Sequence, residues 1–206
     1  MVAKVKICGI TSAEDACNAV WAGADALGFV FFKDSKRCIL PKEAKKIIDI
    51  LPPWIFKVGL FVNEEIPAVK KTADYCGLDF VQLHGDETQS YLKELSTLRI
   101  IKAIRLRDKD SLVKTDGLAC ELVLFDAYCA TQFGGTGTAF DWRLAKEIRK
   151  TKKPYIISGG LTPENVTQAV TMFRPYAVDV SSGVEKAPGK KDKKLMKEFI
   201  THAKTT

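Results

Sequence analysis

Two glycine-containing stretches near the end of the chain have the composition of an anion site. The first, Ser158-Gly159-Gly160, follows an apolar run that we interpret as a strand, and so does the second, Asp179–Gly183. Glycine lets a backbone approach a ligand closely and point N–H groups at it. On successive parallel strands, two such loops form one pocket that suits phosphate, assisted by the N-terminus of a short extra helix. Ser-Gly-Gly alone is equally consistent with a plain turn, but the pair predicts a phosphorylated small-molecule ligand.

Titratable side chains stand at the ends of other apolar runs. Cys8 ends the first run, Gln82 and His84 share one face of the fourth, and Asp126 ends the sixth. A thiol and a carboxyl on different strands at the same end of a sheet are a candidate acid–base pair. Taken singly, Cys8 is better explained as a buried structural thiol, and Asp126 is equally explained as a helix or loop cap. His84 either binds ligand or caps a loop, and we favour the ligand.

Two further charged residues face the same way as the candidate site residues, because side chains alternate along a strand. Lys6 lies two residues before Cys8, and Asp179 begins the second glycine-containing stretch. We interpret Lys6 and Asp179 as a structural ion pair inside the fold, because a buried charge needs a partner. The glycine-rich segment Gly134–Gly137 is either a phosphate cradle or a mobile lid.

The elements that must position these residues alternate between strand and helix patterns along the whole chain. Eight β-then-α repeats predict a single-domain (β/α)8 TIM barrel over residues 1–206. Ser12, Asp141 and Thr162 are the predicted helix-starting residues, with Pro163 in the first turn. The expected strands are Val5–Cys8, Ala26–Phe31, Phe56–Val62, Phe80–Leu83, Ile100–Ile104, Leu122–Asp126, Tyr155–Ser158 and Ala177–Val180. The expected helices are Ala13–Ala22, Lys42–Leu51, Ile66–Cys76, Gln89–Leu95, Lys109–Lys114, Trp142–Lys150, Pro163–Met172 and Lys193–Lys204.

Composition narrows the class of protein. The net charge of +7 comes from lysines that we expect to be scattered over helix faces, with one dense run, Lys190–Lys194, opening the last helix. Without an aromatic and basic platform, we expect no nucleic-acid partner. No apolar run reaches a membrane span, and no signal peptide is evident, so we expect a cytoplasmic protein. The six cysteines form no CxxC pair, so we expect core thiols, no disulfide framework, no metal and no cofactor.

Together these segments resemble the N-(5′-phosphoribosyl)anthranilate isomerase family of tryptophan biosynthesis. The resemblance rests on Lys6–Thr11, Ala26–Phe31, Ser35–Arg37, Val58–Asn63, Val81–Gly85, Asp126-Ala127, Gly134–Gly137 with Phe140–Trp142, Ser158–Val166 and Asp179–Glu185. It implies an Amadori rearrangement of an aminoaldose to 1-(2-carboxyphenylamino)-1-deoxyribulose 5-phosphate. Asp126 matches the general acid that opens the furanose ring, and Cys8 matches the base that removes the C2′ proton. Arg37 matches the residue that holds the anthranilate part.

The same resemblance assigns the phosphate grip and the remaining contacts. Gly159 and Gly160, with Ser181 and Ser182, match the phosphate-binding residues, while Gln82 and His84 are further candidates for binding substrate. Cys38, where an aromatic is common, and the segment Tyr128–Ala130 depart from the family pattern.

Two rival functions and the oligomeric state remain open from the sequence. The histidine-pathway aminoaldose isomerase performs the same rearrangement, but its pattern is a two-fold repeat with an aspartate where this chain has Cys8. A non-catalytic phosphate-metabolite-binding barrel needs no placed acid and base. The protein is a monomer or a homodimer: Phe29, Phe31, Phe32 and Pro52–Trp54 are core or dimer contacts, and we favour the core.

Overall fold

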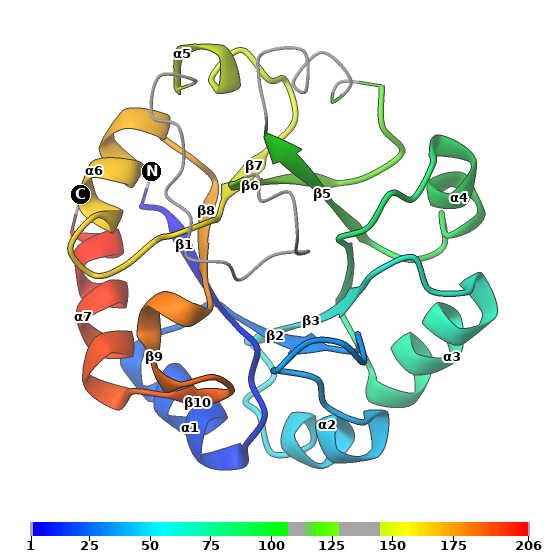
Figure 1. Cartoon of the computed structure of the whole chain (residues 1–206), viewed down its shortest axis with the longest axis horizontal. Helices are drawn as coiled ribbons and strands as arrows, with labels where there is room; N and C mark the ends of the chain where they lie inside the picture. The colour runs from blue at the N-terminus through cyan, green and yellow to red at the C-terminus, as the bar shows by residue number, and fades with distance from the viewer. Residues whose placement is uncertain (1, 107–114, 116, 128–144, 206) are drawn as a thin grey trace.

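A closed barrel of eight parallel strands forms the centre of the protein. The computed structural model describes residues 2–106, 115, 117–127 and 145–205. Each barrel strand pairs with the next along the chain, and β8 pairs with β1, which places Lys6 opposite Asp179. Figure 1 shows the helices arranged around these strands. The predicted (β/α)8 fold is therefore confirmed.

The elements have the following bounds. The barrel strands are β1 (Lys4–Cys8), β2 (Ala26–Val30), β3 (Phe56–Phe61), β4 (Phe80–Leu83), β5 (Ile100–Leu106), β6 (Leu122–Ala127), β7 (Tyr155–Ile157) and β8 (Ala177–Val180). The helices are α1 (Ala13–Ala22), α2 (Pro41–Ile48), α3 (Ile66–Cys76), α4 (Gln89–Glu94), α5 (Ala145–Ile148), α6 (Val166–Phe173) and α7 (Lys193–Lys204). After β8 come a short 3-10 helix, η3 (Ser182–Val184), and the hairpin strands β9 (Glu185–Ala187) and β10 (Lys190–Lys191).

Two apolar layers hold the barrel in shape. The larger layer lies between the strands and the surrounding helices, and Phe29, Phe125 and Phe199 are fully buried in it. The smaller layer fills the barrel at the N-terminal ends of the strands, with Val58, Leu124 and similar side chains. Because side chains alternate along each strand, the inward positions nearer the C-terminal ends are left for polar groups.

Caps explain several helix ends. The Ser12 hydroxyl accepts a hydrogen bond from the N–H of Asp15 at 3.1 Å, as predicted for the start of α1. Gly23 ends the same helix with a φ of 98°, a conformation that glycine adopts without strain. At the start of α7, Asp192 accepts from the N–H groups of Lys194 and Leu195. These local signals fix where the helices that cover β1 begin and end.

The predicted start of the sixth described helix is wrong. We expected Pro163–Met172, with Thr162 as the cap, but α6 begins at Val166. The cause is Asn165, whose side chain accepts from the N–H of Thr162 at 2.8 Å and donates to the carbonyl of Gly160 at 2.9 Å. These bonds hold a turn that leads from the first glycine-containing loop into the helix.

Two expectations about surface and core are also corrected. Trp54, for which we favoured the core, is 90% exposed, whereas Phe29 is buried as expected. Lys191 belongs to β10 rather than to the last helix, and its side chain is fully buried. Gly134–Gly137, Tyr128–Ala130, Lys109–Lys114 and the helix start at Asp141-Trp142 lie outside the described residues.

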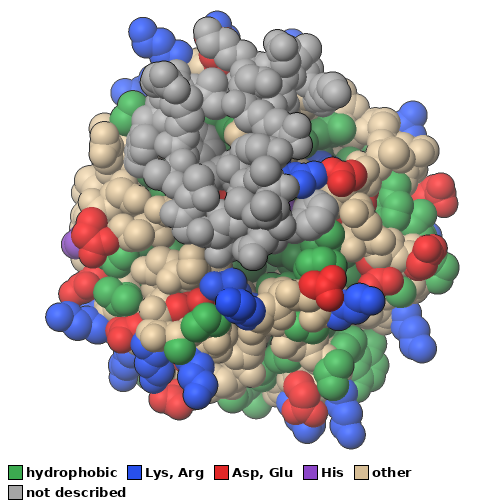
Figure 2. Space-filling model, in the orientation of Figure 1, with side chains coloured by type: hydrophobic (Ala, Val, Ile, Leu, Met, Phe, Trp, Pro, Cys, Tyr) green, Lys and Arg blue, Asp and Glu red, His purple; other side chains and the backbone are tan. Residues whose placement is uncertain are grey.

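The visible surface mixes charges of both signs. Figure 2 shows Lys and Arg side chains interspersed with Asp and Glu around the rim of the molecule. Within the described part of the chain, no helix is long and apolar enough to cross a membrane. Of the described cysteines, Cys8, Cys76 and Cys120 are buried, Cys17 is half-buried and Cys38 is exposed, and all five are free thiols.

Candidate active site

The inward-facing side chains near the C-terminal ends of the strands bring the predicted residues together. Cys8, Gln82, His84 and Asp126 line one pocket. Arg37, Ser158, Asp179 and Ser181 line it too. Gly28 makes room for the thiol, because a Cβ there would lie 2.7 Å from Cys8 Sγ and 3.1 Å from Lys6 Cε. The pocket therefore joins groups from β1, β4, β6 and the loop after β8.

Lys6 and Asp179 form the ion pair that the sequence predicted. The Lys6 ammonium donates to Asp179 Oδ1 at 2.8 Å, and both side chains are buried. The hydroxyl of Ser158 donates to the other carboxylate oxygen at 3.1 Å. Burial alone would lower the pKa of Lys6, but attraction to Asp179 and to Cys8 outweighs it and raises the pKa to about 12. The ammonium thus stays charged beneath the thiol.

The thiol of Cys8 is held mainly in its neutral form. Burial raises its pKa above the ordinary value, since a thiolate loses its hydration in a closed site. The Lys6 ammonium lowers the pKa, and the Asp179 carboxylate beside it acts in the opposite direction. Because Asp179 neutralises much of the charge of Lys6, the ammonium offsets only part of the rise in the Cys8 pKa that burial causes.

Asp126 is joined to β4 by a short chain of buried hydrogen bonds. Its Oδ2 lies 3.1 Å from Nε2 of His84, and Nδ1 of His84 lies 2.9 Å from the amide nitrogen of Gln82. The other amide atom, Gln82 Oε1, is buried without a hydrogen-bond partner among the described residues. His84 therefore does more than cap a loop: it contacts the candidate acid directly.

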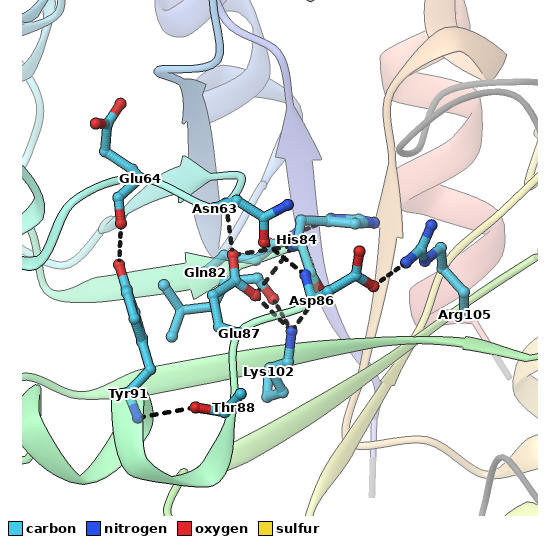
Figure 3. Close-up of polar contacts among 12 residues, drawn as sticks. Asn63, Glu64, Gln82, His84, Asp86, Glu87, Thr88, Tyr91, Lys102 and Arg105 are labelled. Atoms are coloured by element: carbon cyan, nitrogen blue, oxygen red, sulfur yellow. Dashed lines mark hydrogen bonds and ion pairs between the residues drawn. The ribbon is translucent and has the colours of Figure 1, made fainter.

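A second buried pair, which the sequence analysis missed, supports the loop that follows β4 (Figure 3). The Lys102 ammonium donates to Glu87 at 2.6 Å and to the carbonyls of Leu83 and Gly85. The Glu87 carboxylate in turn accepts from the backbone N–H groups of Gly85 and Asn63. The available signal was Lys102 itself, a charged residue inside the apolar run of β5, where burial requires an anionic partner.

Arg37 is anchored by another residue that sequence reasoning did not select. Its Nε and Nη2 donate to the two carboxylate oxygens of Glu185 at 2.8 and 2.7 Å, and this contact raises the pKa of Arg37. Lys191 donates to Glu185 at 2.8 Å as well. The cluster holds two cations and one anion, so it keeps a net positive charge beside the pocket.

The two glycine-containing stretches lead into loops that contact each other. Gly159 and Gly160 have φ values of 89° and 65°, which place them in the left-handed region. A Cβ on Gly183 would lie 1.9 Å from the carbonyl oxygen of Leu161, so only glycine allows the second loop to approach the first. Ser182 begins the short helix η3 that was expected beside the pocket.

This arrangement defines a class of protein. A closed parallel barrel with a polar pocket at the C-terminal ends of its strands, and with paired glycine loops after the last two strands, is typical of barrel enzymes that act on phosphorylated metabolites. A model of the family described as "N-(5'phosphoribosyl)anthranilate (PRA) isomerase" matches residues 5–202. The chain belongs to this family, and it is an isomerase of tryptophan biosynthesis.

Individual relatives cover almost the whole chain. The N-(5′-phosphoribosyl)anthranilate isomerase of Trichlorobacter lovleyi is 51% identical, with 98% of each chain covered. The structure of the Thermotoga maritima isomerase superposes with a TM-score of 0.92 at 42% identity, over 99% of this chain and the whole of the other. Another structure from that organism is of monomers generated from the dimeric isomerase. A further isomerase structure, in complex with reduced 1-(o-carboxyphenylamino)-1-deoxyribulose 5-phosphate, has a TM-score of 0.89 at 41% identity, covering 99% of this chain and all of the other.

Proposed function

We propose that this protein converts N-(5′-phosphoribosyl)anthranilate to 1-(2-carboxyphenylamino)-1-deoxyribulose 5-phosphate, with Asp126 as general acid and Cys8 as general base. The observation that carries the two roles is that both side chains line one pocket, from β6 and β1. Asp126 gives its proton to the furanose ring oxygen, which opens the ring to a Schiff base. Cys8 removes the C2′ proton to give an enolamine, which tautomerises to the ketone.

Lys6 acts on the base without taking part in proton transfer. Because burial raises the pKa of Cys8, few molecules carry the thiolate that the reaction requires. The Lys6 ammonium lies on the same face of β1 and partly offsets this effect. Its pairing with Asp179 keeps the ammonium in place, so the pair sets the electrostatics of the thiol.

The phosphate of the substrate binds at the paired loops. The N–H groups of Gly159, Gly160, Ser182 and Gly183 have no protein acceptor among the described residues, and they belong to loops in mutual contact. Such a group of backbone donors at the start of a short helix suits a phosphate dianion. Ser181 adds a hydroxyl that already lies 3.4 Å from the Lys191 ammonium.

Arg37 binds the anthranilate carboxylate. Glu185 fixes the guanidinium by its Nε and Nη2 groups, which leaves the Nη1 side for a ligand. Without Lys191, the Glu185 carboxylate would cancel the charge of Arg37; with it, the cluster remains attractive to an anion. Gln82 and His84 line the same pocket.

We also infer that the protein works as a homodimer in the cytoplasm. At the N-terminal ends of the strands, a cavity of about 670 Å³ is lined by aromatic residues, among them Phe56, Phe80, Tyr176 and the exposed Trp54, together with charged residues such as Arg99. An exposed apolar side chain at a cavity with aromatic walls can pair with the same surface of a second copy under two-fold symmetry. A reducing compartment suits a reaction that depends on the free thiol of Cys8.

The test of the isomerase mechanism is an activity assay with phosphoribosylanthranilate generated in situ. The decay of substrate fluorescence is followed in EDTA for the wild-type protein and for Cys8→Ser, Asp126→Asn and the exposed-thiol control Cys38→Ser. We expect Cys8→Ser and Asp126→Asn each to lose about two orders of magnitude or more in kcat, while Cys38→Ser keeps full activity. Near-normal turnover by Cys8→Ser would remove the base assignment, and near-normal turnover by Asp126→Asn the acid assignment.

A further inference from the structure

Lys191 has a fully buried side chain that no proton transfer of the proposed reaction uses. Its ammonium donates to the carbonyl oxygen of Ser181 at 3.1 Å and to Glu185 at 2.8 Å, and it lies 3.4 Å from the Ser181 hydroxyl. An ammonium has three N–H groups, so these contacts account for all of them. Because the side chain is 0% exposed, Lys191 acts on a bound ligand only through the residues that it holds.

The backbone around Lys191 is fixed on both sides. Its own N–H donates to Oδ2 of Asp15 on α1 at 3.1 Å, and Figure 1 shows the hairpin of β9 and β10 beside that helix. The N–H of Asp192 donates to the carbonyl of Val184, the last residue of η3, at 2.9 Å. The ammonium therefore reaches Ser181 from a backbone that is tied to two other elements.

The bond to the Ser181 carbonyl also determines the direction of the next N–H group. In a trans peptide the C=O of Ser181 and the N–H of Ser182 lie in one plane and point in opposite directions. Holding the oxygen at the ammonium thus aims the Ser182 N–H away from Lys191. The backbone donor to the same oxygen, the N–H of Val184, is 3.5 Å away, so Lys191 makes the closer contact.

The ammonium strengthens the donor that it orients. Hydrogen bonds in series polarise one another, so a cation on the carbonyl oxygen makes the N–H of the same peptide a better donor. Burial lowers the pKa of Lys191, and attraction to the Glu185 carboxylate opposes that effect. Glu185 is therefore the partner that makes a buried cation tolerable at this place.

We propose that Lys191 is a positioning residue for the phosphate end of the site: through the Ser181 carbonyl it points the Ser182 N–H at the phosphate of the substrate. The same ammonium holds Glu185, which in turn fixes Arg37. One buried cation thus aligns both anion-binding ends of the pocket. This role rests on the phosphate site proposed above at the paired glycine-containing loops.

Net charge is the rival explanation, because any nearby cation attracts phosphate. Two variants separate the rival from the proposal. Lys191→Met removes the ammonium and keeps a side chain of similar length. The double variant Lys191→Met/Glu185→Gln removes one cation and one anion, so the cluster with Arg37 keeps its net charge while the Ser181 carbonyl still lacks its donor.

The first measurement is the dissociation constant of inorganic phosphate, determined by calorimetry at fixed salt. We expect it to rise about tenfold or more both in Lys191→Met and in the double variant, since each loses a hydrogen bond from a charged group. Lys102→Met is the control, because it breaks a similarly buried pair with Glu87. It should lower stability and keep the phosphate affinity within about twofold of wild type.

The second measurement follows backbone amides by ¹⁵N–¹H NMR while inorganic phosphate is added. In the wild-type protein we expect the Ser182 amide proton to move downfield together with those of Gly159 and Gly160. In Lys191→Met the two glycine amides should still respond, and the Ser182 response should fall to less than half. Neither measurement needs turnover, so neither depends on the acid and base assignments.

Several results would overturn the proposal. Phosphate affinity within about twofold of wild type in Lys191→Met would do so, and the same affinity in the double variant would leave charge as the explanation. A wild-type spectrum in which Gly159 and Gly160 respond but Ser182 does not would refute it without any variant. A spectrum in which none of these amides responds would remove the proposed phosphate site itself, and the role of Lys191 with it.

Discussion

Gly28 is the position where the smallest change should disturb the candidate base most directly. It lies on β2 opposite Cys8, and the two strands pair there in register. A Cβ at this position would lie 2.7 Å from Cys8 Sγ and 3.1 Å from the Cα of Cys8 and from Lys6 Cε. Because carbon atoms pack best about 3.5–4.0 Å apart, Gly28→Ala must displace the thiol by about 1 Å.

The displacement has separable effects on stability and on rate. Inserting a methyl group into a packed interior lowers the free energy of unfolding by about 1–3 kcal/mol. A misplacement of about 1 Å in a reacting group reduces turnover by about 10²-fold, which corresponds to about 2.7 kcal/mol of activation free energy. Since the nearest atoms to a Cβ at Gly28 belong to Cys8 and Lys6 and not to the paired glycine-containing loops, we expect KM to change much less than kcat.

Gly59 supplies a matched control on the neighbouring strand. Its Cβ would lie 2.4 Å from Leu78 Cδ1 and 3.0 Å from a ring carbon of Phe61, so alanine is equally crowded there. The contacts belong to the layer between barrel and helices, far from the thiol. Steady-state kinetics and urea unfolding are measured for both variants. We expect Gly59→Ala to lose stability and keep kcat; a Gly28→Ala protein with wild-type kcat would refute the reasoning.

Two further predictions concern the thiol and the subunit contact. The Cys8 thiolate, followed as the 240 nm absorbance difference between wild type and Cys8→Ser, should appear only above the ordinary pH range of a thiol, because burial raises its pKa. In Lys6→Met, which removes the cation that lowers this pKa, the titration should move to still higher pH; a shift to lower pH would contradict the assigned electrostatics. Light scattering should give the wild-type protein roughly twice the 22.8 kDa mass of one chain, and Trp54→Lys should yield monomers. Trp21→Lys, at an equally exposed tryptophan on α1, is the control, and a monomeric wild type would exclude the dimer.

The sequence was most informative where local periodicity determines structure. Alternating apolar runs gave every barrel strand, because inward and outward positions repeat every second residue. The same alternation placed Lys6 with Cys8 and Gln82 with His84, and in the structure the members of each pair contact each other. The ion pair of Lys6 with Asp179 was also predictable, since strand ends that close a barrel bring the first and last strands together.

What the sequence did not reveal depends on contacts between distant segments. Glu185 follows the second glycine-containing stretch, and nothing local indicates that it holds Arg37 from the loop after β2 and Lys191 from a hairpin. Asn165 looked like an ordinary helical residue, yet its two side-chain bonds delay the start of α6. Trp54 is a large apolar residue of the kind expected in a core, and only the tertiary structure shows that it is exposed and lines a cavity.

The distribution of compensated charges explains how one end of this barrel can hold the proposed acid, the proposed base and the two proposed anion sites. Lys6 with Asp179, Lys102 with Glu87, and the cluster around Glu185 each pair a buried cation with an anion. Breaking such a pair leaves an uncompensated buried charge, which is strongly destabilising. The pairs therefore fix the frame of the pocket that Cys8, Gln82, His84 and Asp126 line. That division predicts that charge-removing substitutions in the frame reduce stability first, whereas Gly28→Ala reduces kcat more than it reduces substrate binding.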